Sequence, residues 1–194
     1  MAWNALAKGL KLADERSYPT NRQWWEEQRD LIFEEMMEKG WNEDLQSFTQ
    51  SYGSDVVEAS LLQMLNIGCL SPRDARMRST VAPIERTLIR DSLVYRYDPS
   101  RAAPDGLEGE QGTFTMCTFW LVEALTRSGR LDDARFLFER MRGYASPLGL
   151  YAEENGPTGE LQGNFPQAFT HLALISAAFN LDRALGAVEL VRAA

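Results

Sequence analysis

Segments with almost no charged side chains alternate along this chain with segments that are rich in them. The charge-poor segments are Met1–Ala7, Ala59–Pro72, Gln111–Val122 and Asn164–Leu181. The charged segments that follow them are Arg22–Lys39, Arg73–Asp91, Arg130–Arg142 and Asp182–Arg192. The last three charge-poor segments begin at residues 59, 111 and 164, which are 52 and 53 residues apart. A nearly constant spacing of this size predicts a repeated structural unit.

The charged segments have the pattern of surface helices. In Arg22–Lys39 the apolar residues fall mainly on one helical face and the acidic residues lie largely opposite, and Gly40 supplies a helix stop. Ser71-Pro72 predicts an N-cap and first turn for the next charged helix. Ser128-Gly129 followed by Asp132-Asp133 predicts a tight turn between two helices.

This alternation predicts two concentric layers of helices. A helix that is apolar around its circumference must be buried on all sides, whereas an amphipathic helix has a solvent face. We therefore expect an all-α fold, an α/α toroid or solenoid of about four helical hairpins. Only Leu93–Tyr97 has the pattern of a strand, and Asp98–Gly112 and Ser146–Gly163 are predicted loops. Both loops lead from an outer to an inner helix, so they gather at one end, where we expect a functional site.

Composition narrows the class of protein. The 194 residues suit one domain, and a net charge of −8 without a Lys/Arg block argues against nucleic acid as a partner. The apolar runs fall short of the ~20 residues that span a bilayer, so no membrane partner is expected. Two isolated cysteines, Cys69 and Cys117, make neither a disulfide framework nor a metal cage. A reduced, cytoplasmic protein without metal or cofactor is the expectation.

The sequence lacks the residue sets of most known catalytic sites. The single histidine, His171, lies within the last charge-poor segment, and one histidine with two lone cysteines makes no zinc site. His171 is either a hydrogen-bonded core residue or a residue that contacts substrate. The adjacent Glu153 and Glu154 lie in the second predicted loop. Partial burial and a like-charged neighbour would raise a carboxyl pKa, as a general base requires, although two solvated glutamates fit the spacing equally.

Several colinear stretches resemble one enzyme family. They are Tyr-Ala-Glu-Glu at 151–154, Gly-Asn-Phe-Pro-Gln-Ala-Phe-Thr-His-Leu-Ala-Leu-Ile at 163–175, Met-Ala-Trp-Asn-Ala-Leu at 1–6, Ser-Phe-Thr-Gln-Ser-Tyr-Gly at 47–53, Glu-Ala-Ser-Leu-Leu at 58–62, Leu-Val-Tyr-Arg-Tyr at 93–97, and Gly-Thr-Phe-Thr-Met-Cys-Thr at 112–118. Together they resemble glycoside hydrolase family 15, which contains glucoamylases, glucodextranases and bacterial trehalases. The resemblance implies a six-hairpin α/α barrel, of which residues 1–194 would be the C-terminal portion of the catalytic domain.

The resemblance also implies an activity and a set of site residues. Members of the family hydrolyse terminal α-linked glucose, in trehalose or malto-oligosaccharides, with inversion. A carboxylic acid protonates the leaving oxygen, and a carboxylate ~6.5–9.5 Å away activates water. By the match, Glu153 is the general base and Glu154 its supporting neighbour. The implied substrate-binding residues are Arg96, Tyr95, Phe114 and Gln167, with the guanidinium donating to sugar hydroxyls.

One element of the family pattern is missing from this sequence. The general acid of the family lies in a Trp-Glu motif upstream of the Met-Ala-Trp stretch, and the chain starts at that stretch. We therefore expect the chain alone to be inactive, and to associate with itself or with a missing N-terminal portion through uncovered apolar helices. Two other functions stay open. They are a non-catalytic carbohydrate-binding or scaffold remnant, and a helical-repeat interaction module suggested by Gly129–Arg135.

Overall fold

The computed structural model describes residues 1–98, 100–101 and 112–193. Its α-helices are α1 (Ala2–Arg16), α2 (Arg22–Lys39), α3 (Gln63–Asn66), α4 (Ala75–Leu88), α5 (Thr115–Arg127), α6 (Leu131–Arg142) and α7 (Ala168–Ala193), and the 3-10 turn η1 (Ala59–Leu62) runs into α3. The strands are β1 (Trp41–Asn42), β2 (Ser47–Phe48), β3 (Ile89–Arg90), β4 (Leu93–Val94), β5 (Thr113–Phe114), β6 (Glu154–Asn155) and β7 (Leu161–Gln162). The predicted all-α class is thus confirmed.

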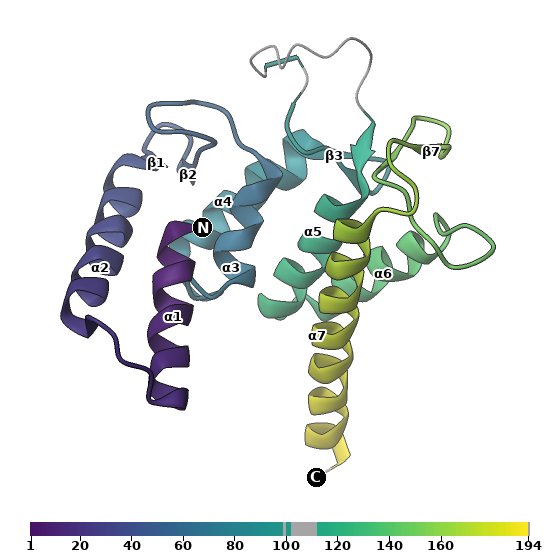
Figure 1. The fold of residues 1–194 in the computed structure, drawn as a ribbon. Helices are drawn as coiled ribbons and strands as arrows, with labels where there is room; N and C mark the ends of the chain where they lie inside the picture. Colours follow the sequence, from purple (N-terminus) through teal and green to yellow (C-terminus); the bar gives the residue numbers. More distant parts are fainter. Residues whose placement is uncertain (99, 102–111, 194) are drawn as a thin grey trace.

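The helices pack as successive hairpins, and α5 is in contact with α3, α6 and α7. Helices α1 and α2 pack on each other, η1 packs on α4, and α5 packs on α6. Helix α7 lies alongside α5, and α3 contacts α5 from another side (Figure 1). This arrangement places the N-terminal hairpin and α7 at opposite sides of the molecule, with α5 between them (Figure 1).

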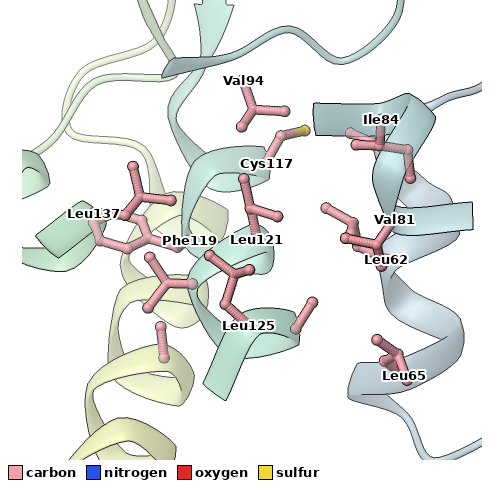
Figure 2. Packing of buried hydrophobic residues seen from close by; sticks show 14 of the residues in the cluster. Leu62, Leu65, Val81, Ile84, Val94, Cys117, Phe119, Leu121, Leu125 and Leu137 are labelled. Atoms are coloured by element: carbon pink, nitrogen blue, oxygen red, sulfur yellow. The ribbon is translucent and has the colours of Figure 1, made fainter. Parts of the chain in front are cut away.

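The charge-poor sequence of α5 forms the centre of the core. Phe119, Leu121 and Leu125 are almost completely buried. Figure 2 shows these side chains between Leu62, which precedes α3, and Leu137 of α6. Burying each such side chain stabilises the fold by roughly 1.5–3 kcal/mol. The prediction that charge-poor helices are inner and charged ones outer is confirmed for α5 and α6.

Two predictions about helices are wrong. The segment Asp182–Arg192 does not form a separate outer helix, because it continues α7, which is a single helix of 26 residues. The described residues therefore form three hairpins and one long helix. The start of α4 is also later than expected: Asp74, not Ser71, is its N-cap, and the Asp74 carboxylate accepts the N–H of Arg76 at 2.8 Å.

The strands differ more from the prediction than the helices do. Of Leu93–Tyr97, only Leu93–Val94 is a strand, and it pairs with β3. The predicted loop Ser146–Gly163 contains β6 and β7, which form a three-stranded antiparallel sheet with β5. The predicted loop Asp98–Gly112 lies mostly outside the described residues. In the described part of the chain, no helix is both long and apolar enough to cross a membrane.

Candidate active site

A small antiparallel sheet positions the two adjacent glutamates. Its central strand β6 begins at Glu154, which is paired with Phe114 on β5 and with Gln162 on β7. Side chains alternate between the two faces of a strand, so Glu154 and Asn155 point to opposite sides of this sheet.

The segment that carries the glutamates is held at the first turns of two helices. At the start of α5, the Thr115 N–H donates to the carbonyl oxygen of Glu153 at 3.0 Å, and the Asn155 amide donates to the Thr115 hydroxyl at 2.9 Å. At the start of α7, the Thr170 hydroxyl donates to the carbonyl oxygen of Ala152 at 3.2 Å. Two core helices therefore determine where this short segment lies.

Glu153 is half-buried, and one of its carboxylate oxygens is fully engaged. Its Oε2 accepts the backbone N–H of Asn164 at 3.0 Å and the Asn164 side-chain amide at 2.8 Å. Within the described residues no hydrogen bond reaches Oε1. Gly163 lies against this carboxylate, since a Cβ at that position would lie 2.9 Å from both Cβ and Oε2 of Glu153. The carboxylate thus has a defined orientation and one oxygen available to a ligand or to water.

Glu154 occupies a more enclosed position beside a second charge. Its Oε2 accepts the N–H of Gly112 at 2.9 Å. Burial raises the pKa of Glu154, and the negative charge of Glu153 raises it further, while the Gly112 hydrogen bond and the positive charge of Arg96 oppose these effects. Glu154 therefore lies within electrostatic range of both Glu153 and Arg96.

Arg96 is contacted on one edge of its guanidinium, and about half of its side chain stays exposed. Its side chain is 53% exposed, and its Nε lies 3.8 Å from Oε1 of Glu58. The guanidinium carbon lies 5.4 Å from the centre of the Tyr97 ring. The Arg96 carbonyl oxygen accepts the N–H of Ala59 at 2.9 Å.

Glu58 is a site residue that sequence reasoning missed. Its side chain is only 16% exposed, and it is the carboxylate that pairs with Arg96. The signal in the sequence was its place directly before a charge-poor segment, as the first residue of the Glu-Ala-Ser-Leu-Leu stretch. A charged residue at the entrance of an apolar element is buried at a cost unless it has a partner.

The other three predicted binding residues are less closely grouped. Phe114 is half-buried and lies beside Glu154 in the sheet. Tyr95 lines a separate cavity of about 430 Å³, whose wall also contains Asn155 and Tyr144. Gln167 is half-buried, and its backbone N–H donates to the carbonyl oxygen of Tyr151 at 3.0 Å. The structure therefore brings Phe114 next to Glu154 in the sheet, while Tyr95 lines the cavity beside Asn155.

His171 and the cysteines do not contribute a metal site. Both ring nitrogens of His171 are hydrogen-bonded, to Gln167 O and Tyr151 N, which agrees with the core-histidine interpretation. Cys69 and Cys117 are unpaired, and burial raises the pKa of both thiols. Among the described residues no group of three histidine, cysteine or acidic side chains is arranged to hold a metal ion.

The sequence is similar to a known protein family and to several of its members. The model of the family "Glycosyl hydrolases family 15" matches residues 1–179. A trehalase of Mycobacterium tuberculosis is 46% identical over 185 residues, which are 95% of this chain and 27% of that protein. A trehalase of Thermoplasma volcanium is 36% identical over 187 residues, 95% of this chain and 29% of that protein. The chain therefore spans less than a third of the length of these relatives.

Solved structures of glycosidases share the fold of this chain. A glycosidase superposes with a TM-score of 0.77 at 19% identity, over 92% of this chain and 49% of the other. A glycosidase variant in complex with glucose also superposes with a TM-score of 0.77, over 93% of this chain and 50% of the other. At this identity the likeness concerns the fold, and it accounts for about half of each solved chain.

Proposed function

Because this chain belongs to glycosyl hydrolase family 15, we propose that it supplies the base-carrying side of a glycosidase active site. The observation that carries the proposal is the Glu153 carboxylate, oriented by Asn164 with Oε1 left available, next to Glu154, which lies within electrostatic range of Arg96. A water-activating carboxylate beside an arginine that binds hydroxyls suits the hydrolysis of a sugar acetal.

In this proposal Glu153 is the general base. Its Oε2 is held by two donors of Asn164, so Oε1 remains to accept a proton from the attacking water. Inversion needs a carboxylic acid on the opposite side of the sugar, ~6.5–9.5 Å away, which protonates the leaving oxygen. We propose that this acid comes from outside residues 1–194 and that the chain alone is therefore inactive. Glu154 supports the base by placing a second, more enclosed carboxyl group beside it.

Arg96 is the proposed sugar-binding residue. Its planar fork of donors suits two adjacent hydroxyls, and the Glu58 carboxylate limits how the guanidinium can turn. Phe114 is proposed as an apolar wall next to Glu154. Tyr95 and Gln167 are proposed to act indirectly: Tyr95 lines the cavity that also contains Asn155, and the Gln167 N–H donates to the carbonyl oxygen of Tyr151.

The proposed substrate is an α-linked glucoside, with trehalose as the first candidate. The support is the identity of 46% and 36% to proteins that are named trehalases. Malto-oligosaccharides are the alternative within the same reaction class. The helical-repeat interaction module is disfavoured because the family match extends through the α5–α6 hairpin on which it was based.

The proposed partner is a complementary portion of the same catalytic domain, to which residues 1–194 contribute the C-terminal part. The support is an apolar stripe on α7, whose members Phe169, Leu172, Ile175 and Phe179 are 60–65% exposed. Exposed stripes of this kind mark interaction surfaces. A cytoplasmic location is part of the proposal and is supported by two unpaired cysteines. Self-association through the α7 stripe is the competing outcome, which sedimentation of the chain alone would reveal as a dimer.

A chimera tests this proposal. The 185-residue part of the Mycobacterium tuberculosis trehalase that matches this chain is replaced by this chain, and trehalose hydrolysis is followed by NMR. We expect one α-glucose and one β-glucose as first products, since only the attacked sugar inverts. Glu153→Gln should lower kcat by about 10²–10⁴-fold, whereas Glu139→Gln on the outer surface of α6 should leave it unchanged.

The outcomes of the chimera experiment are distinct. A folded chimera without hydrolysis, or one that tolerates Glu153→Gln, contradicts the proposal. Hydrolysis by the isolated chain contradicts the proposed need for an acid from elsewhere. Glucose binding that Arg96→Ala abolishes, without turnover in the chimera, would favour the non-catalytic carbohydrate-binding alternative.

A further inference from the structure

The imidazole of His171 completes a ring of hydrogen bonds with the backbone of Tyr151, two residues before Glu153, and with that of Gln167. The Tyr151 N–H donates to Nε2 of His171 at 3.4 Å, and Nδ1 of His171 lies 2.7 Å from the carbonyl oxygen of Gln167. The Gln167 N–H donates in turn to the carbonyl oxygen of Tyr151 at 3.0 Å. The first turn of α7 is thereby tied to the backbone that leads into β6.

These partners determine the tautomer of His171. A carbonyl oxygen can only accept, so Nδ1 carries the hydrogen, and Nε2 offers its lone pair to the Tyr151 N–H. The ring also packs edge-on against the Tyr151 ring, with centroids 5.9 Å apart. Both nitrogens are therefore occupied by backbone groups, and His171 acts on the chain rather than on a ligand.

The ring of hydrogen bonds is close to Glu153 along the chain. Tyr151 precedes Glu153 by two residues, and Ala152 between them is held by the Thr170 hydroxyl of the same α7 turn. A shift of the Tyr151 backbone therefore moves the residue that carries the proposed base. A misplacement of about 1 Å at a reacting group can lower a rate by about 10²-fold.

We propose that His171 is a positioning residue, which holds the Tyr151 backbone and through it sets the place of the Glu153 carboxylate. Its catalytic consequence rests on the proposed function, whereas the hydrogen-bond ring exists in the chain alone. Phe at this position keeps a ring that can pack on Tyr151 and removes both the Nε2 acceptor and the Nδ1–H donor. Gln keeps an acceptor within reach of the Tyr151 N–H.

The test compares His171→Phe with His171→Gln in the trehalase chimera. We expect Phe to lower kcat by about 10–100-fold with KM changed by less than about threefold, because sugar contacts at Arg96 are untouched. His171→Gln should restore kcat to within about threefold of the parent chimera. Melting temperatures of the parent and both variants provide the control: a loss of kcat caused by loss of the fold would come with a lower melting temperature, whereas a positioning role lowers kcat in a protein that stays folded.

A second measurement uses the isolated chain and needs no activity. Hydrogen exchange at the Tyr151 amide should be at least about tenfold faster in His171→Phe than in the parent chain or in His171→Gln. Equal exchange in all three, or a kcat that Gln does not rescue, overturns the inference. An inactive parent chimera combined with the expected exchange pattern would instead contradict the proposed function and leave the role of His171 in the fold standing.

Discussion

Glu153 and Asn164 bind each other in both directions. The Glu153 N–H donates to the carbonyl oxygen of Asn164 at 3.0 Å, while the Asn164 N–H and side-chain amide donate to Glu153 Oε2 at 3.0 Å and 2.8 Å. Asn164 thus contacts both the backbone and the carboxylate of the proposed base. Substitutions of Asn164 therefore measure how much this pairing contributes to catalysis.

Asn164→Ala should lower kcat of the chimera about tenfold, because a hydrogen bond to a charged group is worth roughly 1.5–3 kcal/mol and this one is partly exposed. Asn164→Asp should lower it further, since it replaces a donor by a second negative charge. Steady-state kinetics of the two variants provide the measurement. An Asp variant as active as the parent would show that the pairing does not orient the base.

Gly163→Ala should destabilise the fold more than Gly129→Ala does. Both glycines have positive φ, 71° and 78°, so each alanine adds a strain of about 1–2 kcal/mol. Only at Gly163 would the new Cβ also lie 2.9 Å from Glu153, whereas nothing lies within 4 Å at Gly129. Urea unfolding gives the difference between the two variants, and equal losses would mean that Glu153 moves aside freely.

Glu154 should make the fold less stable as the pH rises. Its folded-state pKa is raised above the ordinary value of 4.5, mainly by burial, so the native state binds its proton more tightly than the unfolded state does. The free energy of unfolding therefore falls as the pH rises from that ordinary value through the raised one. Glu154→Gln keeps an acceptor for the Gly112 N–H and should remove this part of the slope. Unfolding of both proteins across this pH window checks the prediction, and parallel curves would contradict it.

Glu123 should contribute more to stability than any exposed carboxylate of the outer layer. Its side chain, 6% exposed, accepts Arg127 at 2.6 Å and the Ser176 hydroxyl of α7 at 2.7 Å. Glu123→Leu leaves these donors without their acceptor and should cost about 3 kcal/mol.

Glu139 is the matched control for Glu123. Its carboxylate also pairs with an arginine of its own helix, Arg142, but both side chains are more than half exposed. Glu139→Leu should therefore cost less than about 1 kcal/mol. Denaturant unfolding of the two variants gives the comparison, and equal costs would show that the α5–α7 contact does not depend on Glu123.

The helices of the outer layer could be predicted closely. Helix α2 spans Arg22–Lys39 and is followed by Gly40, as the pattern indicated. Helix α6 ends at Arg142 and has two aspartates in its first turn, again as expected. These features depend on neighbours within one or two helical turns, so a single sequence contains them.

The continuity of α7 could not be read from charge alone. The change from an apolar to a charged stretch at Asp182 suggested a new element, but a change in charge does not interrupt backbone hydrogen bonding. Gly186 has the lowest helix propensity near the predicted boundary, and its cost of about 1 kcal/mol is smaller than the gain from continuing the helix.

The amino-acid sequence by itself identified α5 as an inner and α6 as an outer helix, whereas the charge-poor starts of α1 and α7 are only partly buried, and it placed two adjacent carboxyl groups in the segment that leads into α7. Only the tertiary structure decided that Glu154 pairs with Phe114, that Glu58 faces Arg96, and that His171 holds the backbone of Tyr151. The physical reason is separation along the chain. Strands of two residues carry no periodicity, and each of these partners lies 20 to 40 residues from the other, so the pairings exist only once the helix core has brought the segments together.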